Sequence, residues 1–118
     1  MISQTKEPQN IIDIAKLKET FMGDSNIIKQ ILSAFQDTVQ SFEEEFKTLE
    51  SECDQEQLSR LVHGLKGSSA NIRADSVASQ AARLQQLIDQ QEEYSEALNL
   101  LLASMSLLEQ EINKIKAQ

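Results

Sequence analysis

Apolar residues recur every three or four positions along most of the chain, the spacing that places them on one face of an α-helix. The stripe is longest between Tyr94 and Ile115, where seven apolar positions are separated alternately by four and three residues. A similar stripe runs from Phe35 to Leu49. Regular stripes of this kind are typical of helices that pack against other helices. The pattern therefore predicts a helical protein.

Polar breaks divide the chain into one short helix followed by four long ones. An aspartate precedes each of the first four helices and can cap it, because its carboxylate can accept from the free backbone N–H groups of the first turn. Gly23 can end the first helix, and Gln57 can complete a capping box with Asp54. The predicted helices cover about residues 13–22, 24–51, 55–72, 75–88 and 93–116, with Asp13, Asp24, Asp54 and Asp75 as caps of the first four.

Composition agrees with packed helices. One proline and three glycines in 118 residues are too few for a turn-rich β fold, and with few aromatic residues the core must be mainly aliphatic. Long amphipathic helices with short connections favour antiparallel neighbours. We expect an all-α fold, an antiparallel up-down-up-down four-helix bundle with a short extra N-terminal helix that covers one end. Residues 1–10 are expected to be a flexible tail, and residues 11–118 the bundle domain.

Charge and targeting signals argue against several classes of protein. The formal net charge of −8 argues against nucleic acid as a partner, because phosphate backbones need clustered Lys and Arg. No apolar run is long enough to span a bilayer, and the N-terminus lacks the apolar core of a signal peptide. Cys53 is the only cysteine, so no disulfide framework is expected. We expect a cytoplasmic monomer, and Met1 with the compact length favours a free-standing protein over the end of a hybrid kinase.

His63 is the only histidine and the main candidate for chemistry. One histidine cannot build a histidine-based metal site, but an exposed neutral imidazole is a nucleophile that can carry a phosphoryl group. On a helical projection with Leu58 at zero, the apolar residues of this helix fall within about 60° of Leu58, whereas His63 falls at about 140°. This position argues against a core histidine and leaves an incidental surface histidine as the alternative.

The neighbours of His63 argue against an incidental position. Gly64 and Gly67 both lie in mid-helix, where a glycine costs roughly 1 kcal/mol relative to alanine. Gly67 lies one turn after His63 and removes a side chain where a bulky partner group must approach. Lys66 lies on the flank of the same surface, where its ammonium can offset phosphoryl charge. Nucleophile, clearance and counter-charge therefore meet on one face.

The acidic run from Glu43 to Glu45 is interpreted as a solvated helix face, because most of it lies off the apolar stripe. A di-metal site in a helical bundle needs Glu-x-x-His pairs, and the sequence contains none. The apolar stripe of the last helix is interpreted as core and not as a cofactor site. We therefore expect no metal or cofactor held by this chain itself.

Residues 63–72, which read H-G-L-K-G-S-S-A-N-I, resemble the signature of histidine-containing phosphotransfer (HPt) domains, H-x-L-K-G-S-[SA]-x-x-[LIV]-G-A. Leu17 to Asp24 resembles the family's opening Leu-x-x-x-Phe-x-Gly-Asp stretch. The resemblance extends over about residues 11 to 115. H-x-x-K-G alone is a weak signal, whereas its combination with Ser-Ser-Ala-Asn and the four-helix pattern is specific.

The resemblance implies a relay protein of two-component signalling. His63 is then expected to accept a phosphoryl group from a receiver-domain aspartate of a sensor hybrid kinase and to pass it to a receiver-domain aspartate of a response regulator. In this family Nε2 transfers the group while a neighbour holds Nδ1, Lys66 matches the lysine that steadies the phosphoryl group, and Gly67 matches the glycine that gives access. Gln85 fits the polar residue that the next helix contributes beside the histidine; the alternative is a solvated surface glutamine.

The same resemblance implies what the partners must supply. The chain has no Walker loop and no glycine-rich ATP lid, so we expect no ATP-dependent autokinase activity. The Mg²⁺ and the aspartate that complete the transfer site are expected in the receiver domain. Docking is expected around His63 and, by resemblance, on the short first helix through Ile14 or Leu17.

Arg73 departs from the family pattern, which has glycine before Ala74. That glycine allows a left-handed turn after the phosphorylated helix. With arginine present, we expect the turn to be made elsewhere, for example at Asn71, or the helix to end differently. We also hypothesise that Arg73 contacts an acidic receiver surface.

Two rival functions stay open from the sequence. One is a binding-only adaptor, a helical bundle that docks a receiver or kinase without carrying phosphate. The other is an acidic structural bundle, which leaves Gly64 and Gly67 unexplained.

Overall fold

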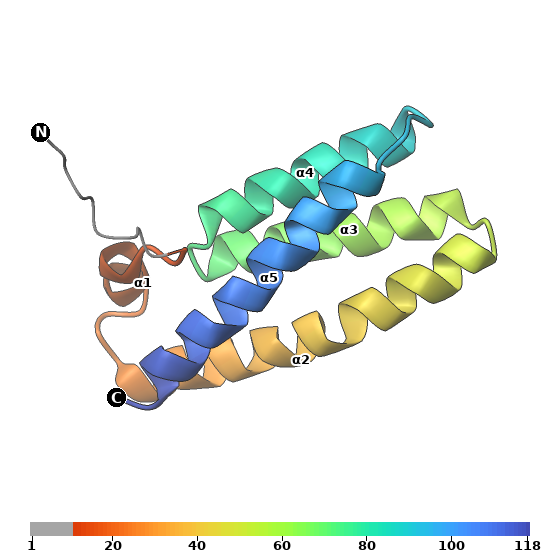
Figure 1. Cartoon of the computed structure of the whole chain (residues 1–118). Helices are drawn as coiled ribbons and strands as arrows, with labels where there is room; N and C mark the ends of the chain where they lie inside the picture. The colour runs from red at the N-terminus through yellow and green to blue at the C-terminus, as the bar shows by residue number, and fades with distance from the viewer. Residues whose placement is uncertain (1–10) are drawn as a thin grey trace, which may run out of the picture.

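Five α-helices make up the computed structural model, which describes residues 11–118 (Figure 1). They are α1 (Ile14–Thr20), α2 (Ser25–Ser51), α3 (Gln55–Asn71), α4 (Asp75–Asp89) and α5 (Ser95–Lys116). No strand occurs in this part of the chain. The all-α prediction is confirmed, and the expected tail at residues 1–10 lies outside the described residues.

The four long helices form a ring in chain order. Each packs against the next, and α2 packs against α5 to close the ring. Figure 1 shows α1 at one end of this bundle, beside the turn from α3 to α4. A backbone hydrogen bond joins the two parts there, from the N–H of Asp13 to the carbonyl of Arg73 at 3.0 Å. The predicted bundle with a short N-terminal helix is therefore confirmed.

The predicted apolar stripes form the core. Ile12 and Leu17, next to and within α1, join the same cluster as the long helices and are each 1% exposed. The buried Ser69 is satisfied because its Oγ donates to the carbonyl of Leu65 at 2.7 Å. None of the described helices is long and apolar enough to cross a bilayer. The largest fully buried side chains are Phe42, Phe46, Ile12, Leu17, Leu32, Leu65, Ile72, Leu84, Ile88, Leu101, Leu108 and Ile112.

Three of the four predicted aspartate caps are confirmed. Asp13 accepts from the N–H of Lys16, and Asp24 accepts from two N–H groups of the first turn of α2, at 3.0 and 3.2 Å. Asp54 accepts from the N–H of Gln57 at 3.1 Å. These bonds satisfy N–H groups that have no partner within the helix.

Two details of the predicted helix starts are wrong. The N–H of Asp54 donates to the carbonyl of Leu49 at 3.0 Å, so the capping box with Gln57 is only half formed. Asp75 is the first residue of α4 and not its cap, which is Ala74 without a side-chain bond. A carboxylate in the first turn still favours the helix, because the N-terminal end carries partial positive charge.

All four turns between helices contain a residue other than glycine in the left-handed conformation. These residues are Met22, Cys53, Arg73 and Gln91, with φ between 56° and 62°. After α3, the N–H groups of Arg73 and the next residue bond back to carbonyls of the last helical turn at 3.0 and 2.9 Å, a Schellman motif. The expectation that Asn71 makes this turn is therefore wrong, because Arg73 itself does so. Each such residue costs roughly 1–2 kcal/mol relative to glycine.

Candidate functional site

His63 lies on the solvent side of α3, as the helical projection predicts. Leu58, Val62 and Leu65 of the same helix are buried against the other helices, whereas the imidazole of His63 is exposed. Lys66 follows one turn later and is also exposed. The helical period thus separates a core face from a solvent-exposed face on one element.

Gln85 of α4 lies beside His63. Its Oε1 is 3.3 Å from Nδ1 of the imidazole, and its Nε2 is 3.4 Å from Oγ of Ser59, one turn before His63. Gln85 and Ser59 are half-buried between the two helices. An amide oxygen can only accept, so Nδ1 carries the proton in this arrangement and the lone pair is left on Nε2. An imidazole held in this way presents Nε2 as the nucleophile.

The surface around Gly64 and Gly67 is open. A Cβ atom built at either position meets no other atom within 4 Å. The fold therefore gives no steric reason for glycine in this helix, where glycine lowers helix stability. The contrast with the turns is informative, because four left-handed positions that favour glycine carry other residues. Two of the three glycines thus lie where the described part of the fold does not require their small size.

The ammonium of Lys66 makes no hydrogen bond or ion pair within residues 11–118. The ion pairs of this part of the chain are Glu43 with Lys47 at 3.6 Å and Glu56 with Arg60 at 4.0 Å, both exposed. An unpaired lysine three residues after His63 can reach an anion on the same surface. The arrangement can therefore combine a nucleophilic nitrogen with a nearby positive charge.

Two further sequence expectations concern the docking surface. Leu17 is 1% exposed and cannot contact a partner, which leaves the half-buried Ile14 on α1. The guanidinium of Arg73 already donates to Oγ1 of Thr20, from Nε at 3.3 Å and from a terminal nitrogen at 3.0 Å. Arg73 therefore ties the turn after α3 to α1.

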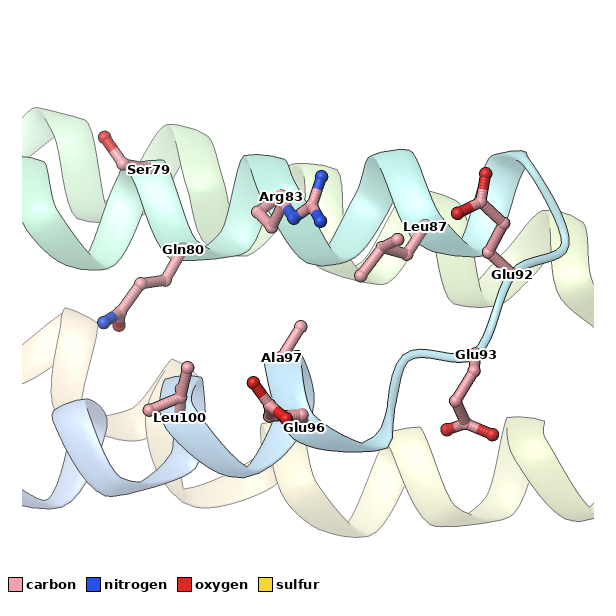
Figure 2. Close-up of a pocket in the computed structure, with 9 residues that line it drawn as sticks. All are labelled: Ser79, Gln80, Arg83, Leu87, Glu92, Glu93, Glu96, Ala97 and Leu100. Atoms are coloured by element: carbon pink, nitrogen blue, oxygen red, sulfur yellow. The ribbon is translucent and has the colours of Figure 1, made fainter.

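A pocket between α4 and α5 lies apart from this site. Figure 2 shows its walls, where Gln80 and Leu87 of α4 point toward α5 and Ala97 and Leu100 of α5 point toward α4. Neither His63 nor Gln85 lines it. Within residues 11–118 no group of three or more His, Cys, Asp or Glu side chains is placed to hold a metal ion. The candidate chemistry of the described chain is thus concentrated around His63.

Sequence reasoning identified His63, Lys66, Gly67 and Gln85, and the structure brings the imidazole and Gln85 into contact. It assigned no role to Ser59. The signal was present, because Ser59 lies four residues before His63 and thus on the same side of the helix. Its contact with Gln85 depends on how α4 lies against α3, which helical spacing alone does not give.

Comparison with known proteins identifies the family. A family model of the Hpt domain matches residues 27–118, which is most of the chain. No curated protein and no solved structure gave a significant match. Hpt domains carry out histidine phosphotransfer in phosphorelays and interact with receiver domains. Since the match covers α3, α4 and α5 in full and nearly all of α2, this chain belongs to the Hpt domain family.

Proposed function

We propose that His63 is the phosphoacceptor of this domain and relays a phosphoryl group between the aspartates of two receiver domains. The observation that carries the proposal is the contact between Nδ1 of His63 and Oε1 of Gln85, because it leaves the Nε2 lone pair of an exposed imidazole available. Nε2 attacks the phosphorus of an aspartyl phosphate, and the carboxylate of that aspartate leaves. The reverse step on a second receiver returns the imidazole to its starting state.

Lys66 and Gly67 serve this transfer in different ways. The ammonium of Lys66 offsets part of the negative charge of the phosphoryl group. The other Lys or Arg residue of α3 is the exposed Arg60, one turn before His63. Gly67 keeps the space beneath the imidazole open for the receiver. Gln85 holds the ring. The Mg²⁺ that offsets phosphoryl charge during transfer is supplied by the receiver domain.

We propose that residues 11–118 act as one functional unit. Ile12 and Leu17 belong to the same buried cluster as the long helices, although the family match begins only at residue 27. The donor is a receiver domain of a sensor hybrid kinase, and the acceptor is a receiver domain of a response regulator.

The test is transfer from a phosphorylated receiver domain. The native chain and the His63→Gln variant are incubated with a receiver labelled at its aspartate, and the label on each chain is measured after acid and after alkali. We expect acid-labile, alkali-stable label on the native chain and none on the variant, whose helical circular dichroism is unchanged because His63 is exposed. Label on the variant would falsify the assignment of His63. Receiver binding without any label on the native chain supports the adaptor function instead.

A further inference from the structure

We propose that Arg60 is a second cation for the phosphoryl group on His63, and that Glu56 competes with this group for the guanidinium. The inference rests on the proposed role of His63 as phosphoacceptor. In the transfer, the Nε2–P bond forms as the O–P bond of the aspartyl phosphate breaks. A group with about two negative charges then lies on α3, whose Lys and Arg residues are Arg60 and Lys66.

Arg60 and Lys66 flank His63 along α3. Arg60 lies three residues before His63, and Lys66 lies three residues after it. At about 100° per residue, the two positions fall about 60° to either side of the imidazole. Side chains of a helix lean towards its N-terminus, so the imidazole extends over the turn that contains Arg60. Both cations are exposed, and a group on Nε2 is therefore within reach of each long side chain.

The present partner of Arg60 holds it weakly. The guanidinium lies 4.0 Å from the carboxylate of Glu56, and both side chains are exposed. An exposed pair at this distance contributes little to stability. A phosphoryl group offers three oxygens, and the planar guanidinium can donate two parallel N–H bonds to them. Within residues 11–118, Arg60 therefore gives up only this weak ion pair when it turns to the phosphoryl group.

The surface beside Arg60 is otherwise anionic. A shallow hollow of about 530 Å³ lies next to His63 and is lined by Gln55, Glu56, Ser59, Arg60 and Asp89. Of these five residues, Arg60 alone is a cation, and Glu56 and Asp89 carry carboxylates. Without Arg60, these carboxylates would leave this side of His63 negatively charged and repel a phosphoryl group. Arg60 thus attracts the phosphoryl group and also offsets its anionic neighbours.

The equilibrium of transfer tests the contact. The native chain and Arg60→Gln are each mixed with a phosphorylated receiver domain, and the four species are measured when transfer reaches equilibrium. The equilibrium constant depends on the free species alone, so a change in receiver docking does not alter it. We expect Arg60→Gln to shift the equilibrium towards phosphorylated receiver by about two- to fivefold, the effect of one exposed ion pair.

Arg83→Gln is the matched control, because it removes the same charge from α4. Arg83 lies two residues before Gln85, about 200° away around the helix, and it lines the pocket between α4 and α5. This variant should leave the equilibrium unchanged. An Arg60→Gln equilibrium that equals the native one, or that shifts no more than Arg83→Gln, overturns the proposal.

Glu56→Gln tests the competition. It frees Arg60, so the equilibrium should shift towards phosphohistidine by about twofold, the lower part of the same range. Glu56 lies two turns from His63, about 10 Å along the axis, where its direct repulsion of the phosphoryl group is largely screened at physiological salt. In the Arg60→Gln background, Glu56→Gln should therefore have little effect. An equal shift in both backgrounds overturns the proposed competition.

A small phosphate donor separates this inference from the proposed function. Phosphoramidate loads the full chain chemically, because Nε2 attacks the phosphorus, the P–N bond breaks and ammonia leaves. The acid dissociation constant of the bound phosphoryl group is then measured by ³¹P NMR. A nearby cation favours the dianion, so Arg60→Gln should lower this constant by the same two- to fivefold, and Arg83→Gln should not change it.

The two failures are distinguishable. A native chain that accepts no phosphoryl group from a receiver refutes the proposed function, yet the chemically loaded chain still tests Arg60. A phosphoryl group that titrates identically in the native chain and in Arg60→Gln overturns the role of Arg60, whatever the outcome with the receiver.

Discussion

Replacing Gly67 with alanine should make the protein more stable and the relay slower. The mid-helix glycine costs about 0.8–1.0 kcal/mol relative to alanine. A Cβ at this position meets no atom within 4 Å, so no steric penalty offsets the gain. For a domain of this size, the free energy of unfolding should rise by about 1 kcal/mol and the midpoint of thermal unfolding by about 4 °C. Urea unfolding and circular dichroism measure both quantities.

The same methyl group should hinder the receiver. Overpacking a close contact typically costs 1–3 kcal/mol, which corresponds to roughly 5- to 150-fold in rate or affinity. Transfer from a phosphorylated receiver to Gly67→Ala should fall within that range. The free energy of unfolding should therefore rise while the transfer rate falls, whereas a simple folding defect lowers both quantities.

Two matched variants make the result interpretable. Gly64→Ala should give the same gain in stability. Its transfer rate shows whether the receiver needs open space only at Gly67, beneath the imidazole, or at Gly64 as well. Gly23→Ala should lose about 1 kcal/mol or more, because Gly23 has φ of 71° and an L side chain there is strained. A less stable Gly67→Ala refutes the inference of open space. A stabilised Gly67→Ala with native transfer refutes the role of Gly67 in access.

Three other predictions follow from contacts away from His63. Gln91→Gly should raise the free energy of unfolding by roughly 1 kcal/mol in urea unfolding, because Gln91 has φ of 57°, whereas Gln90→Gly, next to it in right-handed conformation, should lower it. Burial, followed by the hydrogen bond to Glu50, raises the pKa of Tyr94 from 10.0 to about 12. The stability from this raised pKa is present below pH 10 and is lost between about pH 10 and 12. Tyrosinate absorbance of this single tyrosine should therefore have its midpoint near 12 in the folded chain, and a Glu50→Gln midpoint as high as the native one contradicts the assigned cause. Glu111→Ala should cost about 2 kcal/mol in urea unfolding, because the carboxylate accepts from two backbone N–H groups before α1 at 2.9 and 2.8 Å. Glu111→Gln keeps one accepting oxygen and should lose less, and a Glu111→Ala chain as stable as the native one contradicts the contribution of these bonds.

The parts of the fold that depend on local sequence were predictable. Periodic apolar stripes locate the helices, and the carboxylates of Asp13, Asp24 and Asp54 cap them because each lies next to the N–H groups that it satisfies. The solvent-facing position of His63 follows from the same helical period. Boundaries and faces of single helices are thus readable from neighbouring residues.

The turns and the finer site geometry were not predictable in this way. Arg73 adopts a left-handed conformation without being glycine, because the Schellman hydrogen bonds and the packing of Ala74 hold it there. The link from Ser59 to Gln85 depends on the axial position of α4 relative to α3. That position is set by how the core side chains of the whole bundle interlock, which is information that no single stretch of sequence contains.

The α3–α4 hairpin holds every residue that we assign to the transfer site. His63, Lys66 and Gly67 come from α3, and Gln85 comes from the helix that directly follows it. Contacts between consecutive helices close only a short loop and therefore cost little chain entropy. This part of the molecule should for that reason assemble early during folding. The remaining helices are then free to diverge in sequence as long as they cover the hairpin. A family built on this plan can change its outer surfaces for new signalling partners while the chemistry stays within one local unit.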